Sequence, residues 1–257
     1  NYNMKNNKRI AIIFIGTGKY INLLPNYYRT INQYFIPECE KHFFVFTDGD
    51  IEDSPDNMTV YRVDDKVRPY NHDDNMYKSV GGLYRFDTIY DKVEDFKDYD
   101  WLIYIDGDYY CCSENISYGE YFNDEKPFFG ILHPTFTSYW SKFVGYLPHE
   151  KNKNSWAYVD DSEYDDTYVQ GCMWGGKVPQ VLDMILELKE HTINDLENNI
   201  IPRAQDEAYL NRFRLNNLED FHIVHPSFGK PGNLPDSEFS FKAKMIHCPE
   251  YRSEVLK

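Results

Sequence analysis

The sequence predicts an α/β protein, in which helices pack against a central sheet. The first indication is a series of short, continuous apolar runs that are typical of buried strands; they occupy residues 9–15, 42–46, 101–105 and 127–134. The second is that segments with apolar residues at helical spacing separate these runs, at residues 23–35, 76–96 and 178–191. Strands that alternate with helices indicate an α/β sheet. The 257 residues contain no segment that resembles a domain boundary, which fits a single domain.

The first strand, residues 9–15, is apolar at every position after Arg9 and therefore predicts a buried, parallel strand. A glycine-rich turn, Gly16-Thr17-Gly18-Lys19-Tyr20, follows it, and either meets a nucleotide or simply connects the strand to a helix. The turn is neither a Walker loop nor a complete dinucleotide fingerprint. In the helix at 23–35, Pro25 fits the first turn and Pro37 marks the end.

The next elements complete the first half of the predicted sheet. Residues 42–46 form an apolar strand, and residues 59–63 alternate as a third strand. Residues 64–75 are polar and predict a loop. The helix predicted at 76–96 carries Arg85 away from its apolar stripe.

The strand at 101–108 ends in two carboxylates, Asp106 and Asp108, which flank Gly107. Because burying an unpaired charge is costly, we expect the strand to reach the surface here, at the sheet edge where α/β proteins bind ligands. Carboxylate oxygens suit Mg²⁺ or Mn²⁺, which proteins usually hold with one or two carboxylates and substrate phosphates. Asp-Gly also favours an ordinary turn. A second copy, Asp48-Gly49-Asp50, follows an earlier strand, so the tripeptide alone does not identify a metal site.

The second half of the chain adds a strand at 127–134, which carries His133 near its end. Residues 145–168 are rich in acidic side chains and tyrosine, and form either a solvated surface loop or a lid over a substrate. The helix at 178–191 has the clearest apolar stripe in the chain.

Another helix begins near Pro202, and its first turn carries Asp206 and Glu207. Acidic residues at a helix start are favoured by the helix dipole, so this placement alone does not show a site. A short strand at 222–224 follows, and the chain after Pro226 is predicted to be irregular. The basic residues near its end either fold over a diphosphate or belong to a frayed tail; they are Lys242, Lys244, Arg252 and Lys257.

The composition limits the partners and the compartment. The net charge of −15, from 27 basic and 42 acidic side chains, argues against a nucleic-acid partner, because phosphate backbones bind lysine and arginine. No apolar run approaches the ~18 residues of a membrane span, and the polar start has no signal-peptide pattern. The five cysteines lack zinc-site spacing and are interpreted as reduced thiols. We expect a cytoplasmic protein with no transmembrane segment, although a chain trimmed of an anchor would have the same composition.

Taken in order, the motifs of this chain resemble those of glycosyltransferase family 6, which includes the blood-group A and B transferases. The resemblance is collinear and covers nearly the whole chain. No single motif is specific, but the ordered set is. Asp106 and Asp108 match the Asp-x-Asp pair of the family, whereas Asp48-Gly49-Asp50 falls at an earlier strand. The matching motifs are Phe14-Ile15-Gly16-Thr17-Gly18-Lys19-Tyr20, Tyr104-Ile105-Asp106-Gly107-Asp108, Leu132-His133-Pro134-Thr135-Phe136, Ala157-Tyr158-Val159, Gly175-Gly176 and Gln205-Asp206-Glu207-Ala208-Tyr209-Leu210-Asn211.

The resemblance implies a GT-A fold, with a mixed central sheet flanked by helices, in one catalytic domain over residues 1–257. Residues 1–110 would bind the nucleotide, residues 111–240 the acceptor, and the tail at 241–257 would close over the diphosphate. The implied reaction moves galactose or N-acetylgalactosamine from a UDP-sugar to a hydroxyl of an oligosaccharide or glycolipid. The linkage would be of the α-1,3 type, with the α configuration retained.

The resemblance also implies roles for individual residues. Mn²⁺ (or Mg²⁺) on Asp106 and Asp108 would bridge the diphosphate, and Asp206 would bind donor hydroxyls. Glu207 would act either as the nucleophile of a double displacement or as a group that orients the acceptor and stabilises a front-face transition state. His133 would contact the acceptor. The other implied donor-binding residues are Phe14, Ile15, Gly16, Tyr20, Arg85, Gly107, Gln170, Gly171, Cys172, Arg252 and Lys257.

Departures from the family pattern leave the acceptor open. Gln205 replaces a family histidine, and Ala204 replaces a tryptophan that shapes the acceptor site. Lys78 or its neighbours stand where the family has another tryptophan. Two alternatives therefore stay in view: a retaining GT-A enzyme with another donor such as UDP-glucose, and a sugar-binding protein on a decayed scaffold. The intact acidic residues argue against decay.

Overall fold

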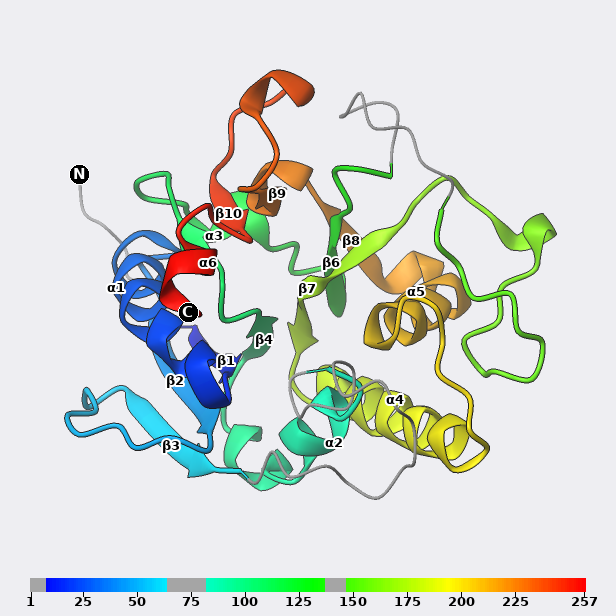
Figure 1. The fold of residues 1–257 in the computed structure, drawn as a ribbon, viewed down its shortest axis with the longest axis horizontal. Helices are drawn as coiled ribbons and strands as arrows, with labels where there is room; N and C mark the ends of the chain where they lie inside the picture. Colours follow the sequence, from blue (N-terminus) through cyan, green and yellow to red (C-terminus); the bar gives the residue numbers. More distant parts are fainter. Residues whose placement is uncertain (1–7, 64–81, 137–146) are drawn as a thin grey trace.

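The computed structural model describes residues 8–63, 82–136 and 147–257 of the chain (Figure 1). The described strands are β1 (Arg9–Ile15), β2 (Glu40–Thr47), β3 (Met58–Arg62), β4 (Trp101–Ile105), β5 (Tyr110–Cys111), β6 (Phe128–Leu132), β7 (Val169–Lys177), β8 (Phe221–Val224), β9 (Lys230–Pro231) and β10 (Met245–His247). They form a large sheet in the order β3-β2-β1-β4-β7-β6-β8 and a small sheet in the order β5-β10-β9. In the large sheet β1 to β4 are parallel, whereas β7 runs antiparallel to both of its neighbours. The sheet is therefore mixed, as predicted.

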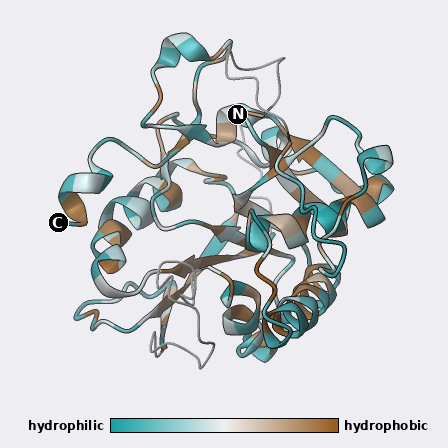
Figure 2. Ribbon diagram, turned by 45° about the vertical axis from the view of Figure 1, so that its right-hand side comes forward, coloured by the Kyte–Doolittle hydropathy of each residue, from teal (hydrophilic) through white to brown (hydrophobic). Residues whose placement is uncertain are grey.

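The helices cover both faces of the large sheet. Those described are α1 (Leu24–Tyr34), α2 (Arg85–Tyr90), α3 (Tyr118–Tyr121), α4 (Gln180–Glu197), α5 (Asp206–Asn216) and α6 (Arg252–Val255), with 3₁₀ helices that include η1 (Gly18–Leu23) and η3 (Val93–Phe96). Ile10 and Ile12 of β1 pack with α1 and α3, whereas Ala11 and Ile13 pack with α2, α4 and α5. Burial on both faces explains why β1 is an unbroken apolar run. Figure 2 shows the result, since the central strands are largely brown and the surrounding loops mostly teal.

The carboxyl ends of β1 and β4 lie at the same edge of the large sheet, because these strands are parallel neighbours. The glycine-rich turn after β1 and the Asp-Gly-Asp turn after β4 therefore leave the sheet side by side. β7 runs back along β4 and pairs Met173 with Ile105. As a result the Asp106 N–H donates to the Cys172 carbonyl at 2.8 Å. This edge is where open α/β sheets place their ligands.

The helix predicted at residues 76–96 is wrong in its extent. Two shorter helices, α2 and η3, form in its C-terminal part, because the backbone at Lys92 leaves the helical region with φ −117° and ψ 21°. Phe86 and Phe96 are nevertheless both buried, which explains the near-helical spacing in the sequence. Residues 64–81 lie outside the described residues; they include the loop predicted at 64–75, the predicted start of this helix, and Lys78.

The sequence does not predict β7, although this strand lies in the middle of the large sheet. Its glycines interrupt the apolar pattern that marks the other strands. At Gly175 close packing requires the glycine, because a Cβ there would lie 2.3 Å from the Leu102 carbonyl oxygen. The glycines that make β7 hard to predict from the sequence are therefore the residues that allow it to pack against its neighbours.

The remaining elements differ from the predictions mainly at their ends. α4 extends to Glu197, beyond the predicted end at residue 191, and α5 begins at Asp206 instead of near Pro202. The prediction of an irregular chain after Pro226 is wrong in part, because β10 pairs with β5 and β9. Strands this short carry no readable periodicity. Among the described residues, none of the helices has the length and apolar character that crossing a bilayer requires.

Candidate active site

A cavity of about 220 Å³ lies between the end of β4, the start of β7 and the first turn of α5. These elements come from distant parts of the chain, so only the folded protein assembles it. The residues that line it are mostly polar: Arg85, Asp106, Gly171, Cys172, Ala204, Gln205, Asp206 and Glu207.

Arg85 is the cation of this cavity, and its side chain is only 7% exposed. Nη1 donates to the Asp206 carboxylate at 2.6 Å and to the Gly171 carbonyl at 2.7 Å, and Nη2 donates to Asp106 at 3.1 Å. The guanidinium also stacks on the Tyr104 ring, 4.1 Å from the ring centroid. The planar guanidinium therefore holds two carboxylates from different elements in fixed positions.

The carboxylates beside Arg85 are harder to ionise than they would be in water. Burial raises the pKa of Asp206 to about 6, against the opposing effect of Arg85. Burial also raises the pKa of Asp106, while Arg85 and the hydroxyl of Tyr104, which donates to this carboxylate, act in the opposite direction. Without the guanidinium, two like charges would be left together in a poorly solvated place.

Glu207 follows Asp206 in the first turn of α5, and its Oε2 accepts a hydrogen bond from the Gly171 N–H at 2.6 Å. Burial raises the pKa of Glu207 to about 7, which the Gly171 N–H partly offsets. Gly171 must be small, because a Cβ there would lie 3.0 Å from the Glu207 Cβ and 3.2 Å from an Asp206 oxygen. Both carboxylates bond to groups across the cavity, so their role is not limited to the electrostatics of a helix start.

Asn211 fixes α5 against β7. Its fully buried side chain donates to the Val169 carbonyl at 2.8 Å and to the Glu207 carbonyl at 2.9 Å, and it accepts from the Val169 N–H at 2.9 Å. At the start of the helix, Gln205 has a φ of 53°, which a residue with a side chain rarely adopts. Strained backbone of this kind is concentrated at functional sites.

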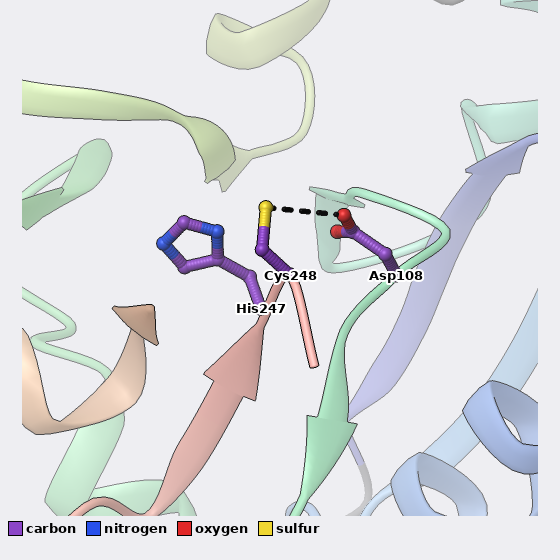
Figure 3. Close-up of side chains that lie close together, drawn as sticks. All are labelled: Asp108, His247 and Cys248. Carbon is purple, nitrogen blue, oxygen red and sulfur yellow. Dashed lines mark hydrogen bonds between the residues drawn. The ribbon is translucent and has the colours of Figure 1, made fainter. Parts of the chain in front are cut away.

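Asp108 belongs to a neighbouring group of side chains. Its Oδ2 lies 3.1 Å from Arg252 Nε and accepts from the Cys248 thiol at 3.4 Å, whereas its buried Oδ1 has no hydrogen-bond partner among the described residues. Figure 3 shows Asp108 with Cys248 and His247, whose potential metal-ligand atoms lie within 4.8 Å of one another. Asp106 is not part of this group. The structure thus brings together an Asp/His/Cys group that could hold a metal ion, and leaves the identity of the ion open.

The C-terminal tail lies against the turn that follows β1. In Figure 1 the red helix α6 lies beside the blue η1 segment, in agreement with their contacts. The Arg252 guanidinium donates to the Tyr20 hydroxyl, and the Lys19 ammonium donates to the Lys257 carbonyl. Arg252 therefore links Tyr20 to Asp108, whereas Lys257 is exposed and makes its contact through the main chain.

Phe14 and Ile15 are buried, so only their main-chain atoms can meet a ligand at the end of β1. The Phe14 ring lies beneath two glycines: a Cβ would come within 2.5 Å of the ring at Gly16 and within 2.9 Å at Gly107. Tyr20, by contrast, is 37% exposed. The glycines therefore let the turns after β1 and β4 lie close to the Phe14 ring.

Two further predicted residues make contacts within the protein. Gln170 is buried, accepts from the Tyr109 hydroxyl at 3.1 Å and donates to the Gly229 carbonyl at 3.4 Å. His133 follows β6, and its Nδ1 lies 2.9 Å from the Thr135 hydroxyl. Burial lowers the pKa of His133 to about 3, so the ring is neutral at neutral pH.

The second Asp-Gly-Asp copy makes local contacts. Asp48 accepts a hydrogen bond from the Gly18 N–H at 2.8 Å, and the exposed Asp50 pairs with Arg62 of β3. These contacts join the turn after β2 to the turn after β1 and to the edge strand. An ordinary structural role therefore accounts for Asp48-Gly49-Asp50.

The sequence analysis assigned no role to four residues of the site region. Tyr104 was indistinguishable from a core residue, although its position two residues before Asp106 places both side chains on one face of the strand. His247 and Cys248 stand at the end of β10, which is too short to be predicted. Asn211 belongs to one of the matching motifs, but the sequence did not indicate what its side chain does.

Comparisons with known proteins identify the family of the chain. The sequence model described as glycosyltransferase family 6 matches residues 1–228. The chain is 27% identical over 206 residues to the O-antigen biosynthesis glycosyltransferase WbnI of Escherichia coli, covering 79% of this chain and 81% of that protein. It is 23% identical over 250 residues to the human globoside alpha-1,3-N-acetylgalactosaminyltransferase 1, covering 94% of this chain and 68% of that protein. The mixed sheet with helices on both faces is accordingly a GT-A type architecture. With a match that spans most of its length, the chain belongs to glycosyltransferase family 6.

Proposed function

We propose that the protein is a metal-assisted, retaining glycosyltransferase that uses a UDP-sugar as donor. It would move galactose or N-acetylgalactosamine to a hydroxyl of an oligosaccharide or glycolipid, in an α-1,3-type linkage. The observation that carries the proposal is the cavity in which Arg85 holds Asp106 and Asp206 beside Glu207. The names of the two relatives, an O-antigen enzyme and an α-1,3-N-acetylgalactosaminyltransferase, support a glycan acceptor and this linkage.

The diphosphate would bind at the carboxylates that follow β4. A divalent cation fits there because Asp108 presents a buried carboxylate oxygen to which none of the residues at 8–63, 82–136 and 147–257 donates a hydrogen bond, and carboxylate oxygens are preferred ligands of Mg²⁺ and Mn²⁺. Held by Asp106 and Asp108, the cation would neutralise charge on the departing UDP. Arg252 contacts Asp108, so the tail at 241–257, with Lys257 at its end, would cover the diphosphate and exclude water.

The uridine would lie over the turn after β1, where Gly18 is exposed and Tyr20 offers an accessible ring, while Gly16 is buried beside the Phe14 ring. The donor sugar would occupy the cavity, and Asp206 would accept hydrogen bonds from its hydroxyls. Because Arg85 fixes Asp206 with a 2.6 Å ion pair, the carboxylate is already oriented before the sugar arrives. Gly171 provides the space, and its neighbours on β7 would discriminate between the two donor sugars.

Glu207 would face the anomeric carbon from the side opposite UDP. Its carboxylate would either attack that carbon as a nucleophile or stabilise the positive charge that develops on the sugar ring. Both roles need the ionised form, and with a pKa raised to about 7 by burial the group is partly ionised at neutral pH. The hydrogen bond from the Gly171 N–H would hold one carboxylate oxygen in place.

A donor screen tests the proposal. We expect release of UDP and hexose from UDP-galactose or UDP-N-acetylgalactosamine in the presence of Mn²⁺, measured by mass spectrometry. Turnover of UDP-glucose alone would instead support the alternative donor. Binding of UDP without turnover of any UDP-sugar would support a sugar-binding protein and would contradict the proposed reaction.

The two Asp-Gly-Asp copies provide a matched control for the metal. Asp108→Asn should abolish Mn²⁺-dependent hydrolysis, whereas Asp50→Asn, the same change in the other copy, should leave it unchanged. An unaltered rate for the wild type in EDTA would remove metal assistance from the proposal.

For Glu207, a hexose-sized mass increase on the peptide that contains it would indicate the double displacement, and its absence under rapid quenching would favour the front-face route.

A further inference from the structure

β10 brings His247 to the turn that follows β4. Because β10 pairs with β5 in antiparallel register, extending that register places His247 opposite Tyr109 and Cys248 opposite Asp108. The side chains agree with this placement. The rings of His247 and Tyr109 stack with centroids 5.5 Å apart, and the Cys248 thiol donates to Asp108 at 3.4 Å. The small sheet therefore positions all three side chains shown in Figure 3.

Within the described part of the chain, polar atoms of two side chains are buried without a hydrogen-bond partner at this point. Asp108 is 6% exposed, and its Oδ1 accepts no hydrogen bond from a described residue. Neither ring nitrogen of His247 has a described partner at hydrogen-bond geometry; the Gly229 main chain lies near the ring, but burial lowers the pKa of His247 to about 4. Buried polar atoms without partners are uncommon and costly. A carboxylate oxygen and an imidazole nitrogen within 4.8 Å of each other form a pair that a cation would satisfy.

We propose that His247 supplies a nitrogen ligand to the divalent cation at Asp108, an inference that rests on the metal-assisted function proposed above. Two atoms that are each about 2.1 Å from one ion are at most about 4.2 Å apart. A small movement of the side chains would therefore bring an Asp108 carboxylate oxygen and the imidazole onto the same ion. The Gly229 carbonyl would accept the other ring N–H, as a main-chain carbonyl commonly does for a ligating histidine.

Cys248 is not assigned as a ligand. Its thiol donates to Asp108 Oδ2, the oxygen that also contacts Arg252, and so leaves Oδ1 for the ion. Sulfur is moreover a soft ligand that suits other metals than Mg²⁺ or Mn²⁺.

A nitrogen ligand determines which cation is preferred. Imidazole suits transition metals, whereas Mg²⁺ prefers oxygen, so the site should bind Mn²⁺ more tightly than Mg²⁺. Removing a residue that only orients a ligand costs about 10–100-fold in metal affinity, and removing a ligand should cost no less. His247→Ala should therefore weaken Mn²⁺ binding at least about tenfold and reduce its advantage over Mg²⁺.

The test is pulsed electron paramagnetic resonance of the protein with Mn²⁺ and UDP, together with a titration of free Mn²⁺. The wild type should show coupling from a directly bonded ¹⁴N, and His247→Ala should lose both this coupling and affinity. The matched control is His191→Ala on α4, where the ring stacks on Trp156 instead of facing the site; it should keep both.

The outcomes separate this inference from the proposed function. If Asp108→Asn abolishes Mn²⁺ binding but the wild type shows no ¹⁴N coupling, His247 is not a ligand and the metal-assisted function stands. If Asp108→Asn leaves Mn²⁺ binding unchanged, both proposals fail. Because the coupling is read from the unaltered protein, a variant that misfolds does not remove the test.

Discussion

Replacing Arg85 with methionine should destabilise the protein in a manner that depends strongly on pH. The guanidinium is 7% exposed and pairs with Asp206, whose side chain is 13% exposed, and with Asp106, at 27%. Methionine keeps much of the apolar volume over Tyr104 but removes the charge. Two partly buried carboxylates would then remain without a counter-ion.

The magnitude follows from the burial of these groups. Breaking a buried ion pair by removing one partner costs about 3–5 kcal/mol of folding free energy. Because Asp106 is partly exposed, we expect a loss of stability near the lower end of this range. The carboxylates can escape the penalty by taking up protons. Without Arg85 their pKa values rise further above the unfolded values, so the folded variant binds more protons than the unfolded chain and becomes more stable as the pH falls. Each unit of added pKa rise corresponds to about 1.4 kcal/mol.

The free energy of unfolding in urea, followed by circular dichroism without metal or nucleotide, measures this effect. At pH 8.5 we expect a loss of about 3 kcal/mol. At pH 5, below the pKa of about 6 that Asp206 has in the wild type, most of the charge penalty should disappear. The control is Arg62→Met, which removes an exposed ion pair with Asp50 and should change stability little at either pH. An equal loss at pH 5 and pH 8.5, or a loss no larger than that of the control, would refute the reasoning.

Other contacts of the cavity lead to measurable changes. Glu207→Gln should lower kcat at least about 100-fold. Because burial raises the pKa of Glu207 to about 7, the variant should also unfold at a higher urea concentration than the wild type above pH 7, but at the same concentration at pH 4.5. Equal unfolding midpoints of variant and wild type at pH 8 would contradict a buried charge at Glu207. Gly171→Ala should reduce both activity and melting temperature, because its Cβ would lie 3.0 Å from Glu207, whereas Gly119→Ala in α3, where a Cβ meets nothing within 4 Å, should not. Asn211→Ala should cost about 1–3 kcal/mol by leaving buried Val169 main-chain groups unpaired, and hydrogen exchange at the Val169 amide should become faster; unchanged protection would show that Asn211 does not hold α5.

Much of the fold could be read from the sequence because its signals are local. A strand buried on both faces is apolar along its buried length, as β1 is from Ile10 to Ile15, and a helix that packs on the sheet, such as α4, carries an apolar stripe. These patterns reflect the surroundings of the side chains directly. The acidic pair after β4 also stood out, because unpaired carboxylates are costly to bury beside an apolar run. The expectation that the strand reaches the surface here is wrong for Asp108, which is 6% exposed and pairs with Arg252. The ordered motifs then sufficed to predict the family.

Tertiary structure decided which of these residues act together. The guanidinium of Arg85 contacts both Gly171 and Asp206, which are far from it in the chain. No local sequence pattern predicts these contacts. The same holds for Asp48-Gly49-Asp50. Its residue types alone do not distinguish a metal site from a turn, and only the structure shows its contacts with Gly18 and Arg62. His247 was beyond prediction for a related reason: a three-residue strand such as β10 has no periodicity of its own. Its position depends on pairing with β5 across more than a hundred residues, and such long-range pairing is a property of the folded chain alone.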